Sequence, residues 1–109
     1  MNSMDYKYED VVKLTKIYPE EAKYIYAALG LSSEAGEVAG KIKKYVRGDY
    51  ESIDEIRNKI IDELGDVLWY VAALALELDT KIDEIKDRNA QKLLNRLKQN
   101  KIKGEGDYR

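Results

Sequence analysis

The chain of 109 residues contains no histidine, no cysteine and only one proline. Without imidazole or thiolate ligands, the usual zinc sites are not expected, and neither is a di-iron centre built on Glu-x-x-His pairs. The same absences remove Ser-His and Cys-His arrangements, which argues against a covalent intermediate. The lack of cysteine also fits a reducing interior, and we expect a cytoplasmic protein.

Long apolar runs and a strong charge of one sign are also missing. The most apolar stretch, residues 67–78, is too short to span a bilayer and is interpreted as a buried helix. Residues 1–5 are polar, unlike the apolar run of a signal peptide. With 19 basic and 21 acidic residues the net charge is −2, which argues against a general nucleic-acid binder. We therefore expect neither a membrane nor a nucleic acid as partner.

The sparse glycine and proline, together with 37% of charged residues, favour an all-α protein. Periodicity and capping signals predict four helices, at 5–17, 20–47, 52–78 and 80–98. Pro19 separates the first two, and Gly48 suits the C-terminal cap of the second. Start signals of the form [ST]-x-x-[DE] at Ser52 and Thr80 open the other two. Residues 99–109 are expected to form a flexible tail.

The block 67–74, Val-Leu-Trp-Tyr-Val-Ala-Ala-Leu, is hydrophobic nearly all round its helix. Such a helix must be covered on most sides, and one chain with two or three other helices can hardly do so. We therefore expect one domain over residues 1–109, a four-helix bundle that is completed by homo-oligomerisation. The assembly is predicted to be a homodimer or a dimer of dimers.

Two copies of a short acidic pattern are the most informative feature of the chain. Glu34 and Glu37 belong to E-A-G-E, whereas Glu63 and Asp66 belong to E-L-G-D. Position 50 is midway between Glu34 and Asp66 and between Glu37 and Glu63, and it lies in the helix-breaking segment 48–52. A helical hairpin that turns there brings all four carboxylates to one level, about 16 Å from the turn at a rise of 1.5 Å per residue.

Four facing carboxylates favour a bound cation. At an effective dielectric constant of 20, two carboxylates about 5 Å apart repel each other by roughly 3 kcal/mol, and a divalent ion between them removes that cost. Hard oxygen ligands suit Mg²⁺, or Mn²⁺ or Ca²⁺. Solvated acids on amphipathic helices are the plainer interpretation of one motif alone, but two mirrored motifs argue against it. The small Gly36 and Gly65 are expected to let the two helices approach closely.

Basic residues accompany the acidic motifs. Lys41 and Lys44 follow Glu37 by four and seven residues, on the same helical face. Such cations suit a substrate with several negative charges, most simply a polyphosphate. Asn89 and Lys92 share a stripe of the last predicted helix and are also able to face phosphate. For Lys41 and Lys44 the alternative is pairing with nearby acids and with the helix dipole, and for Asn89 and Lys92 it is an ordinary solvated face.

With these motifs the chain resembles a known family, the MazG-like all-α nucleoside triphosphate pyrophosphohydrolases. The resemblance is carried by E-A-G-E at 34–37 with the lysine-rich run after it, and by E-L-G-D-V-L-W-Y at 63–70. N-A-Q-K-L at 89–93 and G-E-G-D-Y-R at 104–109 resemble later segments of the same family. The likeness covers roughly residues 5–109.

The resemblance implies hydrolysis of a (deoxy)nucleoside triphosphate to the monophosphate and pyrophosphate, with Mg²⁺, as part of nucleotide-pool house-cleaning. Asn89 and Lys92 become phosphate or sugar contacts. Lys44 stands where several relatives place a base-contacting tryptophan, so a phosphate contact is the role expected for it. The metal ligands that the family pattern assigns are Glu34, Glu37, Glu63 and Asp66.

Two questions stay open in the sequence. Glu37 is the candidate to orient or deprotonate the attacking water. Trp69 or Tyr70 are candidates for base recognition, although a buried core ring is the plainer interpretation of Trp69. The alternative to an enzyme is a catalytically silent helical protein that binds nucleotides or metal and acts in regulation.

Overall fold

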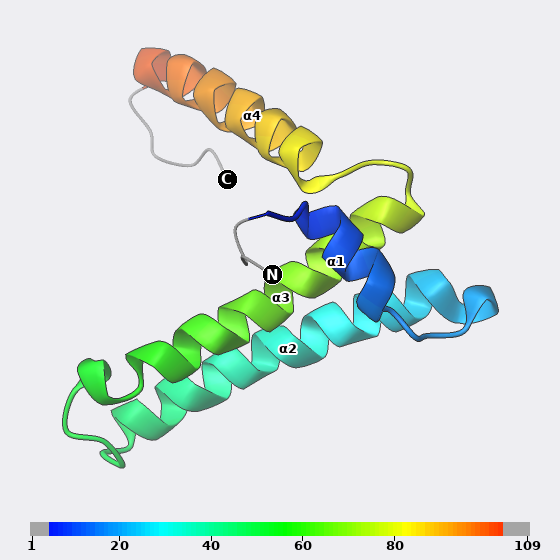
Figure 1. Cartoon of the computed structure of the whole chain (residues 1–109). Coiled ribbons are helices and arrows are strands. Elements are labelled where there is room, and N and C mark those ends of the chain that lie inside the picture. Colours follow the sequence, from blue (N-terminus) through cyan, green and yellow to red (C-terminus); the bar gives the residue numbers. More distant parts are fainter. Residues whose placement is uncertain (1–4, 104–109) are drawn as a thin grey trace.

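The computed structural model describes residues 5–103, and within that range every regular element is helical (Figure 1). The prediction of an all-α fold is therefore confirmed. None of the described helices has the length and apolar composition needed to cross a bilayer. In chain order the elements are α1 (Tyr8–Thr15), η1 (Glu20–Ala22), α2 (Lys23–Val46), η2 (Ile53–Glu55), α3 (Arg57–Glu77) and α4 (Ile82–Lys103).

Helices α2 and α3 form a long antiparallel hairpin that frames the molecule (Figure 1). Gly48 ends α2 with φ 95°, a left-handed conformation that glycine adopts without steric cost, as the sequence predicted. Before the return helix the backbone N–H of Ser52 donates to Glu55 Oε1 at 3.4 Å, as part of the predicted capping box. Ile56 is fully buried behind this turn.

The close approach of α2 and α3 occurs at Gly30, contrary to the prediction for Gly36 and Gly65. A Cβ atom added at Gly36 or Gly65 would meet nothing within 4 Å. At Gly30 the same atom would lie 2.1 Å from Cε1 of Tyr70. The Tyr70 ring therefore rests against the bare backbone of α2, and glycine is required there for space.

Helix α1 packs across α3 and closes a small core. Val12 is fully buried against Ala72 and Ala73, whose small side chains let the two helices come together. Larger, partly buried side chains surround this centre, namely Tyr8, Tyr18, Trp69, Leu76 and Ile82. The helix is shorter than the predicted 5–17, because it begins at Tyr8 and residues 16–17 already belong to the connection to η1.

Helix α4 stands away from the α2–α3 hairpin (Figure 1). Asp79, with φ 60°, lies in the short connection through which the chain leaves α3, and α4 contacts the other helices mainly at α3. The Thr80 hydroxyl donates to Glu84 at 2.6 Å, one residue beyond the predicted partner Asp83. The helix continues to Lys103, beyond its predicted end near residue 98, and residues 104–109 of the expected tail lie outside the described residues.

Candidate functional site

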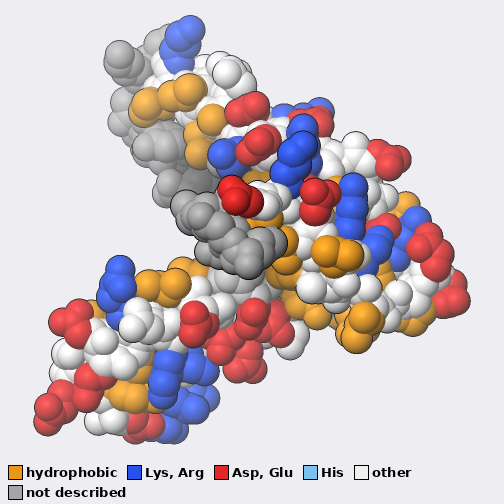
Figure 2. Space-filling model, in the orientation of Figure 1, with side chains coloured by type: hydrophobic (Ala, Val, Ile, Leu, Met, Phe, Trp, Pro, Cys, Tyr) orange, Lys and Arg blue, Asp and Glu red, His pale blue; other side chains and the backbone are white. Residues whose placement is uncertain are grey.

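Three of the four predicted metal ligands meet between α2 and α3. Glu34 comes from α2, and Glu63 and Asp66 come from α3. One carboxylate oxygen of each lies within 4.8 Å of the other two. Acidic side chains gather over the middle of the hairpin, with basic side chains beside them (Figure 2). The sequence symmetry thus led to a real cluster.

Glu34 lies against the other acids of the cluster. The pKa of the Glu34 carboxyl is raised, first by burial and then by the negative charges of Asp66, Glu63 and Glu37. A cation among the three groups would relieve both the desolvation and the repulsion. Its ligands would all be hard carboxylate oxygens, which fit Mg²⁺ or Mn²⁺ rather than a softer metal.

Glu37 does not join this group of three. It is exposed, and three residues of helix turn it about 60° around the axis from Glu34. Lys41, seven residues from Glu34 and therefore on nearly the same face, takes the place beside Glu63, with Nζ 3.3 Å from Glu63 Oε2. The roles of Glu37 as ligand and as catalytic group stay predictions.

A cavity of about 440 Å³ adjoins the acidic cluster. Glu34 and Asp66 belong to its lining and connect it to the candidate metal position. The remaining lining residues are mostly aromatic: Thr15, Ile17, Tyr18, Tyr26, Trp69 and Tyr70. The site therefore combines a carboxylate group with an aromatic hollow large enough for a heterocyclic base.

Contacts among the lining residues fix the aromatic walls. Trp69 Nε1 donates to Thr15 Oγ1 at 2.8 Å, and the Trp69 and Tyr70 rings meet edge to face with centroids 4.9 Å apart. The Tyr18 and Tyr26 rings are 5.3 Å apart. Trp69 is half-buried and packs against the α1–α3 core, so it contributes both to the core and to the cavity.

The sequence analysis named Trp69 and Tyr70 but missed Thr15, Ile17, Tyr18 and Tyr26. A signal for one of them was present, because Tyr26, Gly30 and Glu34 follow one another at intervals of four on α2. No comparable signal marks Thr15 or Tyr18, which reach the site only because α1 docks on α3.

The predicted substrate contacts lie elsewhere in the single chain. Lys44 is exposed near the end of α2. The pKa of the nearby Asp49 is lowered, first by the hydrogen bond from Arg47 and to a smaller extent by the charge of Lys44. Asn89 and Lys92 line a separate surface hollow on α4, of about 350 Å³, together with Ile85 and Arg88. The structure brings none of these three into the lining of the cavity beside Glu34 and Asp66.

Comparison with known proteins gives the family of the chain. The profile of the MazG nucleotide pyrophosphohydrolase domain matches residues 24–100, which hold the acidic cluster and most of α4. The Gene 37 protein of Mycobacterium phage L5 is 45% identical over 85 residues, covering 77% of this chain and 75% of that protein. No solved structure matches the chain. The chain belongs to the MazG nucleotide pyrophosphohydrolase family.

Proposed function

We propose that the chain is a Mg²⁺-dependent enzyme that hydrolyses (deoxy)nucleoside triphosphates to nucleoside monophosphate and pyrophosphate. The observation that carries the proposal is the convergence of Glu34, Glu63 and Asp66 beside an aromatic cavity, in a chain of this family. Such an activity would serve nucleotide-pool house-cleaning in the cytoplasm.

The acidic cluster supports the divalent ion by the chemistry of its donors. Three carboxylates with oxygens within 4.8 Å of one another, one of them with a raised pKa, suit a doubly charged ion and disfavour an empty site. When bound, Mg²⁺ supplies polarisation of the α-phosphate, charge neutralisation on the leaving pyrophosphate and a lower pKa of the attacking water. Mn²⁺ is the expected substitute.

Side chains of the protein would position the attacking water, the phosphates and the base. Glu37, exposed next to the cluster, orients or deprotonates the attacking water. Lys41, already beside Glu63, places a positive charge at the same point and is available to phosphate oxygens. The aromatic cavity accepts the base, with Trp69 and Tyr70 among its walls.

We also propose that copies of the chain associate into a homo-oligomer. Leucines along α4 are exposed in the single chain, Leu93, Leu94 and Leu97 at 41%, 59% and 51%. Leu64 and Leu68 of α3 are also exposed, at 51% and 43%. Burying this apolar surface against a second copy would stabilise a homodimer or a dimer of dimers. We place Asn89 and Lys92 in the substrate site through such an arrangement, with Lys44 as a phosphate contact.

The test is incubation of the purified protein with Mg²⁺ and a panel of canonical and modified triphosphates, with pyrophosphate resolved from phosphate. We expect monophosphate and pyrophosphate, abolished by EDTA and by Glu63→Gln. Asp62→Asn is the matched control, because Asp62 is the exposed neighbour on α3 and makes the same change of charge. Release of orthophosphate would contradict the proposed cleavage. Nucleotide binding without turnover, by the folded protein with metal, would favour a catalytically silent regulatory protein.

A further inference from the structure

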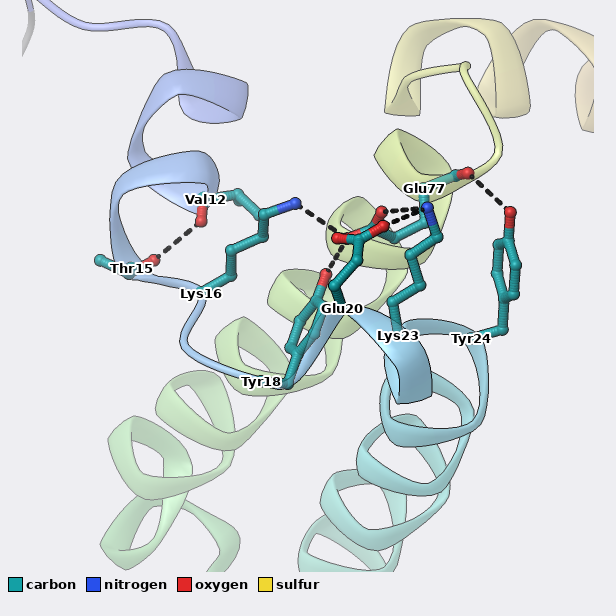
Figure 3. A network of polar contacts seen from close by, with 8 residues as sticks. All are labelled: Val12, Thr15, Lys16, Tyr18, Glu20, Lys23, Tyr24 and Glu77. Atoms are coloured by element: carbon teal, nitrogen blue, oxygen red, sulfur yellow. Dashed lines mark hydrogen bonds and ion pairs between the residues drawn. The ribbon is translucent and has the colours of Figure 1, made fainter.

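Among the acidic side chains that form ion pairs in the described part of the chain, Glu77 is the least exposed. The proposed chemistry does not use it. It is the last residue of α3, and its side chain is 7% exposed. The carboxylate accepts hydrogen bonds from Tyr18 Oη at 2.5 Å and from Lys16 Nζ at 2.9 Å. Lys23 Nζ lies 3.8 Å away, and Figure 3 shows these three side chains converging on Glu77.

The three partners of Glu77 come from one stretch of chain. Lys16 and Tyr18 belong to the connection between α1 and η1, and Lys23 begins α2. The hydroxyl of Tyr24 reaches the backbone carbonyl oxygen of Glu77 at 3.5 Å. One residue at the end of α3 therefore contacts the α1–α2 connection near both of its ends.

This connection supplies a wall of the cavity. Tyr18 lines the cavity that Glu34 and Asp66 share, and its ring lies 5.3 Å from that of Tyr26. Glu77 itself is not among the lining residues. Because the Tyr18 hydroxyl is engaged by Glu77, the ring is held at the cavity by a group outside it.

We propose that Glu77 is a positioning residue, which holds Tyr18 as a wall on which the base of the nucleotide packs. The inference rests on the proposed function, because it takes the cavity beside the acidic cluster as the base site. Aromatic rings bind any base through its face, so fixing Tyr18 strengthens nucleotide binding without entering the chemistry at the phosphate. Loss of Glu77 should therefore raise KM and leave kcat nearly unchanged.

The experiment uses the single tryptophan of the chain, Trp69, as a reporter of binding. Trp69 lines the same cavity, so its fluorescence follows nucleotide binding whether or not turnover occurs. Titrations with Mg²⁺ and nucleoside triphosphate would be compared for the wild type, Glu77→Ala, Glu77→Gln and Tyr18→Phe, alongside KM and kcat. Inorganic triphosphate, which has no base, would serve as a competitor in the same assay.

We expect Glu77→Ala to weaken nucleotide binding on the order of tenfold, which corresponds to about 1.4 kcal/mol. Its kcat should stay within about twofold of that of the wild type. Glu77→Gln keeps an acceptor for the Tyr18 hydroxyl and should recover most of the binding. Tyr18→Phe keeps the ring, loses the hydrogen bond and should weaken binding in the same direction. The inhibition constant of inorganic triphosphate, corrected for the nucleotide affinity of each variant, should not change in any of these variants.

Glu20→Gln is the control, because Glu20 pairs with Lys23 at 2.7 Å, is 77% exposed and makes the same change of charge. Equal weakening in Glu20→Gln and Glu77→Ala would overturn the proposal in favour of a general charge effect. If Glu77→Ala fails to fold, Tyr18→Phe decides, and unchanged nucleotide binding there would refute the positioning role. Nucleotide binding that weakens in Glu77→Ala without any turnover in the wild type would support positioning and refute the enzyme. A wild type that binds no nucleotide would overturn both.

Discussion

Replacing Gly30 with alanine probes the closest contact between α2 and α3. The new Cβ would lie 2.1 Å from Cε1 and 2.4 Å from Cζ of Tyr70, whereas carbon atoms in ordinary contact are about 3.5–4.0 Å apart. The backbone of α2 is held by its helical hydrogen bonds, so the ring has to move by about 1 Å or more. That movement also disturbs the edge-to-face contact with Trp69, whose centroid is 4.9 Å away.

Gly40→Ala isolates the size of this effect. Gly40 lies on the same helix, and a Cβ there would meet nothing within 4 Å. Both variants gain the greater helix propensity of alanine, about 1 kcal/mol. Only Gly30→Ala also suffers overpacking, which costs about 1–3 kcal/mol. The difference in the free energy of unfolding between the two variants therefore equals the cost of displacing Tyr70.

Thermal unfolding followed by far-ultraviolet circular dichroism measures this difference. In a domain of this size, 1 kcal/mol shifts Tm by about 4 °C. We expect Gly40→Ala to melt slightly above the wild type and Gly30→Ala to melt several degrees below Gly40→Ala. If Gly30→Ala melts at or above Gly40→Ala, the ring is not held against α2 as described.

Three further predictions follow from the acidic cluster, from Glu77 and from α4. Mg²⁺ at one hundred times its Kd should raise the free energy of unfolding by about 2.7 kcal/mol; EDTA and Glu63→Gln should remove the gain in a thermal-shift assay, and a gain retained by Glu63→Gln would contradict the site. The pKa of Glu77 is lowered from its ordinary 4.5, mainly by the hydrogen bonds from Tyr18 and Lys16. The stabilisation of the folded protein by ionised Glu77 is therefore fully present above pH 4.5 and is lost as the pH falls through the lower folded pKa. The free energy of unfolding in urea should depend less on pH in that acid range for Glu77→Gln than for the wild type. An equal pH dependence of the two proteins would refute the assignment. Leu94→Glu, at a position 59% exposed on α4, should shift the assembly to monomer in analytical ultracentrifugation with its helix content kept, and an unshifted assembly would exclude this surface from the interface.

The acidic cluster could be predicted from the sequence because two simple facts determine it. A helix breaker at 48–52 forces a hairpin, and equal spacing from that breaker brings Glu34 to the level of Asp66. Spacing does not give the rotation of each helix about its axis. That rotation depends on which residues pack between the helices, above all the Tyr70 ring on Gly30, and it leaves Glu37 exposed.

The cavity was predictable only in part, because two of its walls depend on contacts distant in sequence. Trp69 and Tyr70 follow Asp66 by three and four residues, so a helical pattern could place them beside it. Thr15 and Tyr18 arrive through the docking of Val12 on Ala72 and Ala73, a contact between small apolar residues that has no distinctive pattern. The hydrogen bond from Tyr18 to Glu77, 59 residues away in sequence, is equally invisible before folding.

The position of α4 raises one last question, which a mixing experiment answers. Within one copy, Lys92 lines a hollow on α4 and not the cavity beside Asp66. If α4 of one copy completes the site of another, Glu63→Gln and Lys92→Ala damage sites in complementary ways. In a mixture of the two inactive variants about half of the dimers are mixed, and each then holds one intact site, so roughly a quarter of wild-type activity should return. If Lys92 serves its own chain, every site in the mixture lacks one of the two residues and activity stays at the level of the separate variants.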